Sequence, residues 1–130
     1  MTPEAGFLAA LLVTVGFLLG AAITGRKRII RIHVRFVAGA VLSLGVAIFF
    51  ALKVGERYDL EAAGWITPFH KALAKITTAT YLWPLITGPL ARSGKVRPSV
   101  HRLGAWLALG LTVASTVTGI IMLARATPLY

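Results

Sequence analysis

The feature that most constrains this chain is a series of four long runs without a charged side chain. They cover residues 5–25, 36–52, 76–91 and 103–124. A helix needs about 20 mostly apolar residues to span a bilayer. The first and last runs meet that length, and the middle two reach it if the residues before them lie in the interface, where long cations extend to water. The predicted spans are then about 5–25, 33–54, 68–91 and 101–124.

The composition agrees with a lipid-facing surface. Only 14% of the residues are charged and 57% are hydrophobic, whereas about a quarter of a soluble domain is charged. There is no cysteine, which excludes disulfides, thiolate metal sites and cysteine nucleophiles. The segments between the spans are too short for a soluble domain. We therefore predict a single all-α domain over residues 1–130, an integral membrane four-helix bundle with antiparallel up-down topology.

The charges divide between the two ends of the predicted bundle. Nine of the fourteen cations lie within residues 26–35 and 92–102, in the loops after spans one and three and at the starts of the spans that follow, and all four acids lie on the other side. The positive-inside rule then places both termini on the non-cytoplasmic side. The net charge of +10 is explained by basic loops at a membrane surface, and no nucleic-acid partner is predicted. Because no cation precedes the first run, we interpret it as a retained span and not as a cleaved signal peptide.

Each of the three histidines stands at the start of a predicted span. His33 and His101 begin spans two and four at the cytoplasmic edge, and His70 begins span three at the outer edge. A period of 3.6 residues places each histidine above a face of mostly small side chains. Such faces suit close helix packing and also leave room for a flat macrocycle. The three side chains are therefore either ordinary interfacial histidines or ligands of a cofactor.

Haem is the cofactor that fits this pattern. A b-type haem is held by imidazole nitrogens without a covalent link to cysteine, and two histidines from different helices of a bundle can approach one iron. Haem propionates need cations or water at the membrane edge. Arg31, Arg35 and Arg102 flank the cytoplasmic pair, and Lys71 and Lys75 flank His70.

The segment HRLGAWLALGLTVASTVTGIIML, which begins at His101, resembles the last core helix of small membrane cytochromes b of the cytochrome b-561 type. In that family a histidine opens the helix and a TG pair lies near its far end, here Thr118 and Gly119. The segment FHKALAKITTATYLWPLITGPLARSG is similar to the preceding helix of the family. A four-helix family associated with cytochrome oxidase assembly has a similar layout. The likeness covers roughly residues 33–124.

The resemblance implies a pairing of ligands. In the cytochrome pattern, core helices two and four ligate one haem, and helices one and three ligate the other. Carried over, His33 and His101 would ligate one haem b on the cytoplasmic side. His70 would need a partner on the first span, which contains no histidine. The second site is therefore either empty or completed by another subunit or a non-histidine ligand, and a second haem bound at His70 by this chain alone would be five-coordinate.

Two further features concern packing. Gly16 and Gly20 form a G-x-x-x-G pair in the first span, which predicts a helix–helix contact. Pro84 cannot donate to the carbonyl of Thr80, so a kink is expected in the third span. Such a kink either fits neighbouring helices together or opens a pocket for a quinone or another cofactor.

Motifs of independent catalysis are absent from the sequence. No carboxylate lies within a span, which disfavours proton-coupled exporters, and there is no H-E-x-x-H or P-loop motif. We predict an electron-transfer subunit of a larger membrane redox complex in a bacterial inner membrane. Its expected partners are membrane lipids, other redox subunits and, as a candidate, a quinone. Two alternatives stay open: a haem-free subunit that holds partners or pigments, and an assembly factor for a respiratory oxidase.

Overall fold

The computed structural model describes residues 1–129 and is all-α apart from one pair of very short strands. The helices are α1 (Pro3–Arg26), α2 (Ile30–Arg57), α3 (Ile66–Thr80), α4 (Leu82–Arg92) and α5 (Pro98–Arg125). A 3₁₀ turn, η1 (Leu60–Ala63), precedes α3, and β1 (Tyr58–Asp59) pairs antiparallel with β2 (Thr127–Pro128). The predicted all-α class is confirmed.

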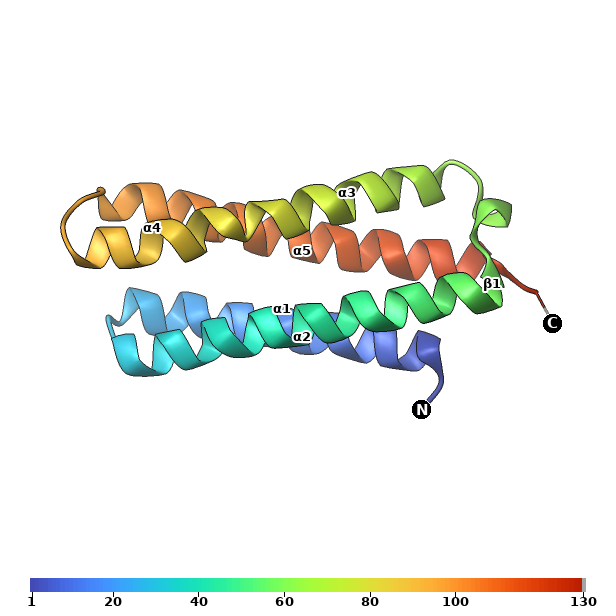
Figure 1. Cartoon of the computed structure of the whole chain (residues 1–130), viewed down its shortest axis with the longest axis horizontal. Helices are drawn as coiled ribbons and strands as arrows, with labels where there is room; N and C mark the ends of the chain where they lie inside the picture. The colour runs from blue at the N-terminus through green and yellow to red at the C-terminus, as the bar shows by residue number, and fades with distance from the viewer. Residues whose placement is uncertain (130) are drawn as a thin grey trace.

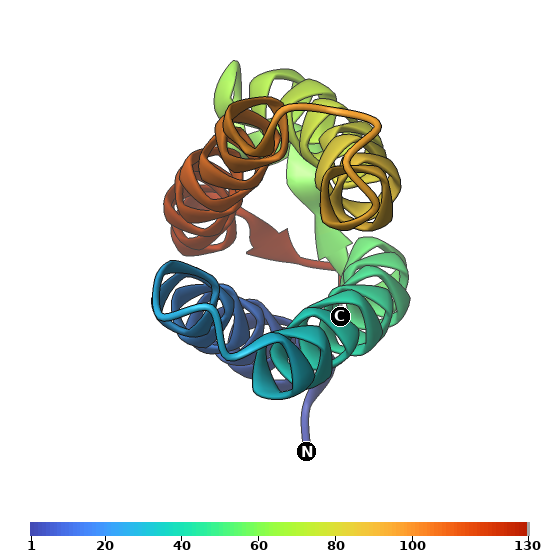
Figure 2. The ribbon, with the colours of Figure 1, turned by 90° about the vertical axis from the view of Figure 1, so that its left-hand side faces the viewer.

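The helices form two hairpins that lie side by side (Figure 1). In the first hairpin α2 packs along α1, and in the second α3 and α4 pack in succession along α5. The hairpins join chiefly where α1 meets α5. Seen along the bundle axis, α2 and α5 therefore occupy opposite corners (Figure 2). This antiparallel up-down order is the one predicted from the spans.

Three of the helices, α1, α2 and α5, are long and apolar enough to cross a membrane. The predicted span 68–91 is divided into α3 and α4, which follow one another with a break at Tyr81. The break comes one turn before Pro84, because proline has no N–H to donate to the carbonyl of Thr80. The interruption that the sequence predicts is thus present, although Tyr81 itself keeps helical dihedral angles of φ −58° and ψ −29°.

The outer surface of the bundle is apolar. Large hydrophobic side chains point outward along all of the long helices, including Leu12, Leu42 and Ile76, which are 60%, 72% and 56% exposed. Many buried positions are small or polar by contrast, as at Ala40 and Thr112, each 1% exposed. A chain with its large apolar residues outside fits a lipid surrounding and not water.

The two ends of the bundle differ in charge, as the sequence predicts. At one end, here called the basic end, residues 27–29 join α1 to α2 and residues 93–97 join α4 to α5. At the other, the terminal end, the described parts of both chain termini lie together with η1 (Figure 1). All four acids, Glu4, Glu56, Asp59 and Glu61, belong to the terminal end. The side of the membrane on which each end lies stays a prediction.

The G-x-x-x-G pair of α1 does not act as one unit. A methyl group added at Gly20 would lie 2.7 Å from the ring of Phe36, so this glycine makes room for an aromatic side chain of α2. A methyl group at Gly16 would meet nothing within 4 Å. Of the two glycines in this motif, only Gly20 therefore forms the predicted helix contact within residues 1–129.

Candidate functional site

His33 and His101 meet at the basic end of the bundle. Their ring centroids lie 6.2 Å apart, and the ring planes are at 84° to one another. His33 belongs to the first turn of α2 and His101 to the first turn of α5, the two helices at opposite corners. Two metal–nitrogen bonds of about 2.0–2.1 Å, plus the two ring radii, give a centroid separation of roughly 6 Å. The centroid separation therefore matches that of two imidazoles bound to one metal ion.

The ring of His33 is fixed by the C-terminal end of α1. Its Nδ1 lies 2.7 Å from the carbonyl oxygen of Ala21. A carbonyl oxygen can only accept, so Nδ1 carries the proton, and the neutral ring keeps a lone pair on Nε2. The ring also lies against Gly25, where an added methyl carbon would be 3.1 Å from Cε1. α1 thus sets both the tautomer and the position of this imidazole.

The ring of His101 is held in the same manner by the end of α4. Its Nδ1 is 3.3 Å from Oγ1 of Thr87. The Thr87 hydroxyl donates its proton to the carbonyl of Trp83 at 2.7 Å, so it accepts from the histidine. A methyl carbon added at the adjacent Gly88 would lie 3.2 Å from Cε1 of His101. His101 therefore also keeps its Nε2 lone pair.

His70 repeats this arrangement at the terminal end. It is 7% exposed, and its Nδ1 lies 2.8 Å from Oγ1 of Thr118 on α5. The Thr118 hydroxyl also lies 3.0 Å from the carbonyl of Ala114, and when it donates its proton there, Nδ1 of His70 is the donor. A methyl carbon added at Gly119 would lie 3.1 Å from Cε1 of the same ring. All three histidines thus present a free Nε2.

A Thr-Gly pair lies beside each histidine, and only the pair Thr118-Gly119 entered the sequence prediction. The pairs are Thr24-Gly25, Thr87-Gly88 and Thr118-Gly119. Each lies toward the C-terminal end of a helix and packs on the histidine near the start of the antiparallel neighbour. Ligand histidines of metal sites donate their second ring nitrogen to a carbonyl or similar group, which orients them. At His101 and His70 the threonine hydroxyl makes that second interaction, and at His33 the carbonyl of Ala21 makes it.

The partner of His70 across the bundle is an aromatic ring and not a ligand. Phe7 of α1 lies with its ring centroid 6.3 Å from that of His70, at 88° between the planes. This geometry is close to that of the pair formed by His33 and His101. α1, which contains no histidine, therefore presents Phe7 where a second ligand would be expected.

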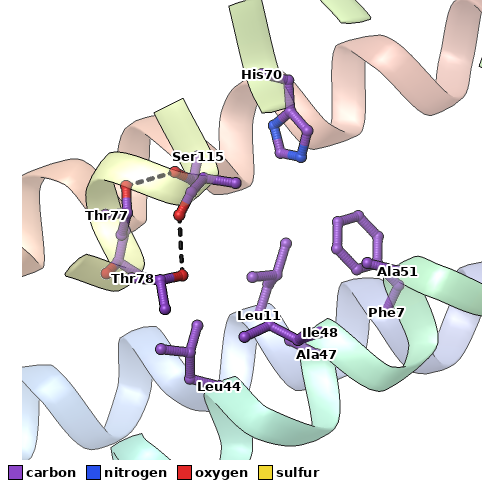
Figure 3. Close-up of a pocket in the computed structure, with 12 residues that line it drawn as sticks. Phe7, Leu11, Leu44, Ala47, Ile48, Ala51, His70, Thr77, Thr78 and Ser115 are labelled. Atoms are coloured by element: carbon purple, nitrogen blue, oxygen red, sulfur yellow. Dashed lines mark hydrogen bonds between the residues drawn. The ribbon is translucent and has the colours of Figure 1, made fainter. Parts of the chain in front are cut away.

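A small cavity adjoins His70 between the two hairpins (Figure 3). Hydroxyl groups of α3 and α5, among them Thr77 and Ser115, form one wall, and side chains of α1 and α2, among them Leu11 and Leu44, form the other. Its volume is about 70 Å³, which is space for a few water molecules. Pockets for larger organic ligands measure about 300–1,000 Å³. A macrocycle at His70 would require these walls to move.

The arginines predicted to bind the propionates differ in their position relative to the histidine pair. Arg31 and Arg35 line a groove with Arg92 of α4. Each lies two residues from His33, which is roughly 200° around the helix, so both leave α2 on the side away from that ring. Arg102 follows His101 directly and is exposed.

The lysines beside His70 lie on the surface. Lys71 forms an ion pair with Glu61, with 3.8 Å between Nζ and Oε1. Lys75 is exposed one turn further along α3. Both point to the outside of the bundle at the level of its terminal end.

Tyr81 and Trp83, beside the break between α3 and α4, both form hydrogen bonds with α5. The hydroxyl of Tyr81 is 2.8 Å from Oγ1 of Thr112, and Nε1 of Trp83 donates to the carbonyl of Val100 at 3.0 Å. The Trp83 ring lies directly over Gly104. At this place the kink serves to fit the second hairpin together, and the quinone pocket stays a prediction.

Residues 1–129 contain no group of three or more histidine, aspartate or glutamate side chains that could hold a metal ion. Haem iron differs from a free ion in this respect, because the protein supplies it with only one or two axial ligands.

Comparison with known proteins adds no identity: no family model, no curated protein and no solved structure matches this chain.

Proposed function

We propose that this chain is a b-type cytochrome, an electron-transfer subunit of a larger membrane redox complex, in which His33 and His101 are the axial ligands of one haem b. The observation that carries the proposal is the pair of imidazoles 6.2 Å apart at one end of the bundle, each with its Nδ1 proton engaged. Histidines that served only to face lipid headgroups would not need to meet.

The residues around the pair fit the proposed group. The carbonyl of Ala21 and the hydroxyl of Thr87 hold the two rings in the tautomer that a metal requires. Gly25 and Gly88 provide the space in which the rings lie. Arg102, exposed beside His101, is the nearest candidate in sequence for a propionate. A bound haem would supply one-electron redox chemistry, and two histidine ligands would close its iron to added ligands.

The setting of this function follows the sequence prediction. A location in a bacterial inner membrane, with both termini outside the cytoplasm, would place the histidine pair at the cytoplasmic edge. Other redox subunits and a quinone are the proposed sources or acceptors of the electron. A second haem at His70 is not needed for this function, and the cavity of about 70 Å³ there favours a single haem per chain.

The proposal is tested by the absorption spectrum of the full chain, purified from a host that loads other b-type cytochromes. Reduction with dithionite should give the α-band of haem b. A pyridine haemochrome assay should return about one haem per chain. A colourless protein that also fails to bind added haemin would refute the proposal and leave the haem-free subunit or the assembly factor.

A glycine substitution tests how closely the site is built. In Gly25→Ala the new methyl carbon lies 3.1 Å from the His33 ring, so the imidazole must shift. We expect haem affinity to fall about tenfold, the lower end of the range for groups that orient metal ligands. Gly16→Ala, on the same helix and with nothing within 4 Å, is the matched control and should leave affinity unchanged. Equal haem affinities for the two variants would show that the packing of His33 against Gly25 does not affect haem binding. Haemin titration of the apoprotein measures both.

A further inference from the structure

The groove at the basic end is a separate feature from the histidine pair. It has a volume of about 430 Å³ and is lined by three arginines, Arg31, Arg35 and Arg92, with Ile30 and Val34. Four of these residues belong to the first two turns of α2, and Arg92 is the last residue of α4. The groove therefore lies between two helices of different hairpins, on the side of α2 away from His33.

The charge of this groove is not compensated by the chain itself. Arg31 and Arg35 are four residues apart on one helix, where like charges repel, and Arg92 adds a third guanidinium from α4. Every acid of the chain lies in α1's first turn, at the end of α2, in β1 or in η1, which are all at the terminal end. An anion that neutralises the three arginines must therefore come from outside the chain.

The start of α2 adds to the attraction for an anion. Its N-cap residue, Ile29, makes no side-chain hydrogen bond to the first turn, and that turn contains no acid. The unpaired backbone N–H groups and the helix dipole favour negative charge at this place. Ile30 and Arg31, which line the groove, belong to that same turn. Two independent features thus converge on one anion-binding position.

We propose that this groove binds the phosphate headgroup of an anionic phospholipid. Guanidinium groups form paired hydrogen bonds with phosphate oxygens, and basic pockets between membrane helices on the cytoplasmic side suit such headgroups. Ile30 and Val34 are 39% and 54% exposed and offer an apolar surface beside the arginines for the glycerol and the first carbons of the acyl chains. The lipid would bridge α2 and α4 where no protein acid does so.

The test uses the full chain in a zwitterionic detergent, with phosphatidylglycerol, cardiolipin or phosphatidylcholine added in separate titrations and adducts counted by native mass spectrometry. We compare the wild type with the triple variant R31Q/R35Q/R92Q. A second triple variant, R26Q/K27Q/R28Q, removes the same charge from the adjacent end of α1 and its loop. Circular dichroism of each variant confirms that the helices are retained.

We expect the wild type to retain one anionic lipid in preference to phosphatidylcholine. Each arginine near a membrane surface contributes roughly a fivefold factor to such binding, so the groove variant should lose at least about tenfold and the control variant less than about twofold. Equal losses in both variants would overturn the proposal, because they would indicate diffuse attraction to the whole basic end. If the groove variant instead lost haem and kept its lipid, the arginines would be propionate partners and the lipid site would be refuted. The single variant R92Q, on α4, gives the same comparison should the triple variant not fold.

Discussion

Replacing His101 with alanine is expected to abolish the low-spin, six-coordinate spectrum of the proposed haem. The structure brings only one other imidazole to this level of the bundle within residues 1–129, that of His33 at 6.2 Å between ring centroids. Without His101 the iron would keep one axial ligand, become high-spin and five-coordinate, and bind more weakly. His33→Ala should give the same result from the other side. Resonance Raman and absorption spectra of the purified variants measure the change.

His70→Ala is the matched control for this prediction. His70 packs against Thr118 and Gly119, much as the other two histidines pack against Gly25 and Gly88. It lies, however, at the terminal end of the bundle. Its loss should leave the low-spin spectrum in place. An unchanged spectrum in His101→Ala, or its disappearance in His70→Ala alone, would show that the pairing of His33 with His101 is wrong.

Replacing Phe7 with histidine is expected to raise the haem content from about one to about two per chain. Phe7 and His70 lie with their ring centroids 6.3 Å apart at 88°, close to the geometry of the pair formed by His33 and His101 at the basic end. An imidazole is smaller than a phenyl ring, so the change also enlarges the cavity beside His70. α1 and α3 would then supply a second pair of histidines, of which the native α1 contributes none.

Phe17→His serves as the control for this gain. Phe17 belongs to the same helix but packs on Phe36 and over Gly39 of α2, away from any histidine. It adds an imidazole without creating a pair, and haem content should stay at that of the wild type. A pyridine haemochrome assay against protein concentration compares the variants. If Phe7→His also stays at the wild-type content, Phe7 does not occupy the place of a ligand.

The helices and the meeting of His33 with His101 could be predicted because both depend on local patterns. Runs of apolar residues fix helix length, and histidines at the starts of parallel helices must come to the same end of a bundle. The break at Tyr81 followed from the missing N–H of Pro84. Predicting these features does not require knowing which face of one helix packs against which face of another.

The features that were not predicted depend on packing between helices. That Phe7 faces His70 requires the relative rotation of α1 and α3, which no single helix pattern specifies. The seats at Gly25, Gly88 and Gly119 are repeated in sequence, but their meaning appears only when each faces a histidine of a neighbour. The short pair of β1 and β2 was missed because two residues carry no periodicity.

The division of hydrogen bonds between the hairpins has a consequence for how the molecule is put together. Thr14 donates to Ser43 at 2.8 Å within the first hairpin, and Thr77 and Ser115 are joined at 2.9 Å within the second. Each half can thus enter the bilayer with these polar groups already satisfied. Along the bundle the halves then meet through apolar and small side chains, which bind helices weakly in lipid, and at the terminal end the pairing of β1 with β2 also joins them. Because His33 belongs to one half and His101 to the other, a metal held between them would act as a cross-link, and occupancy by the cofactor would govern whether the two halves stay assembled.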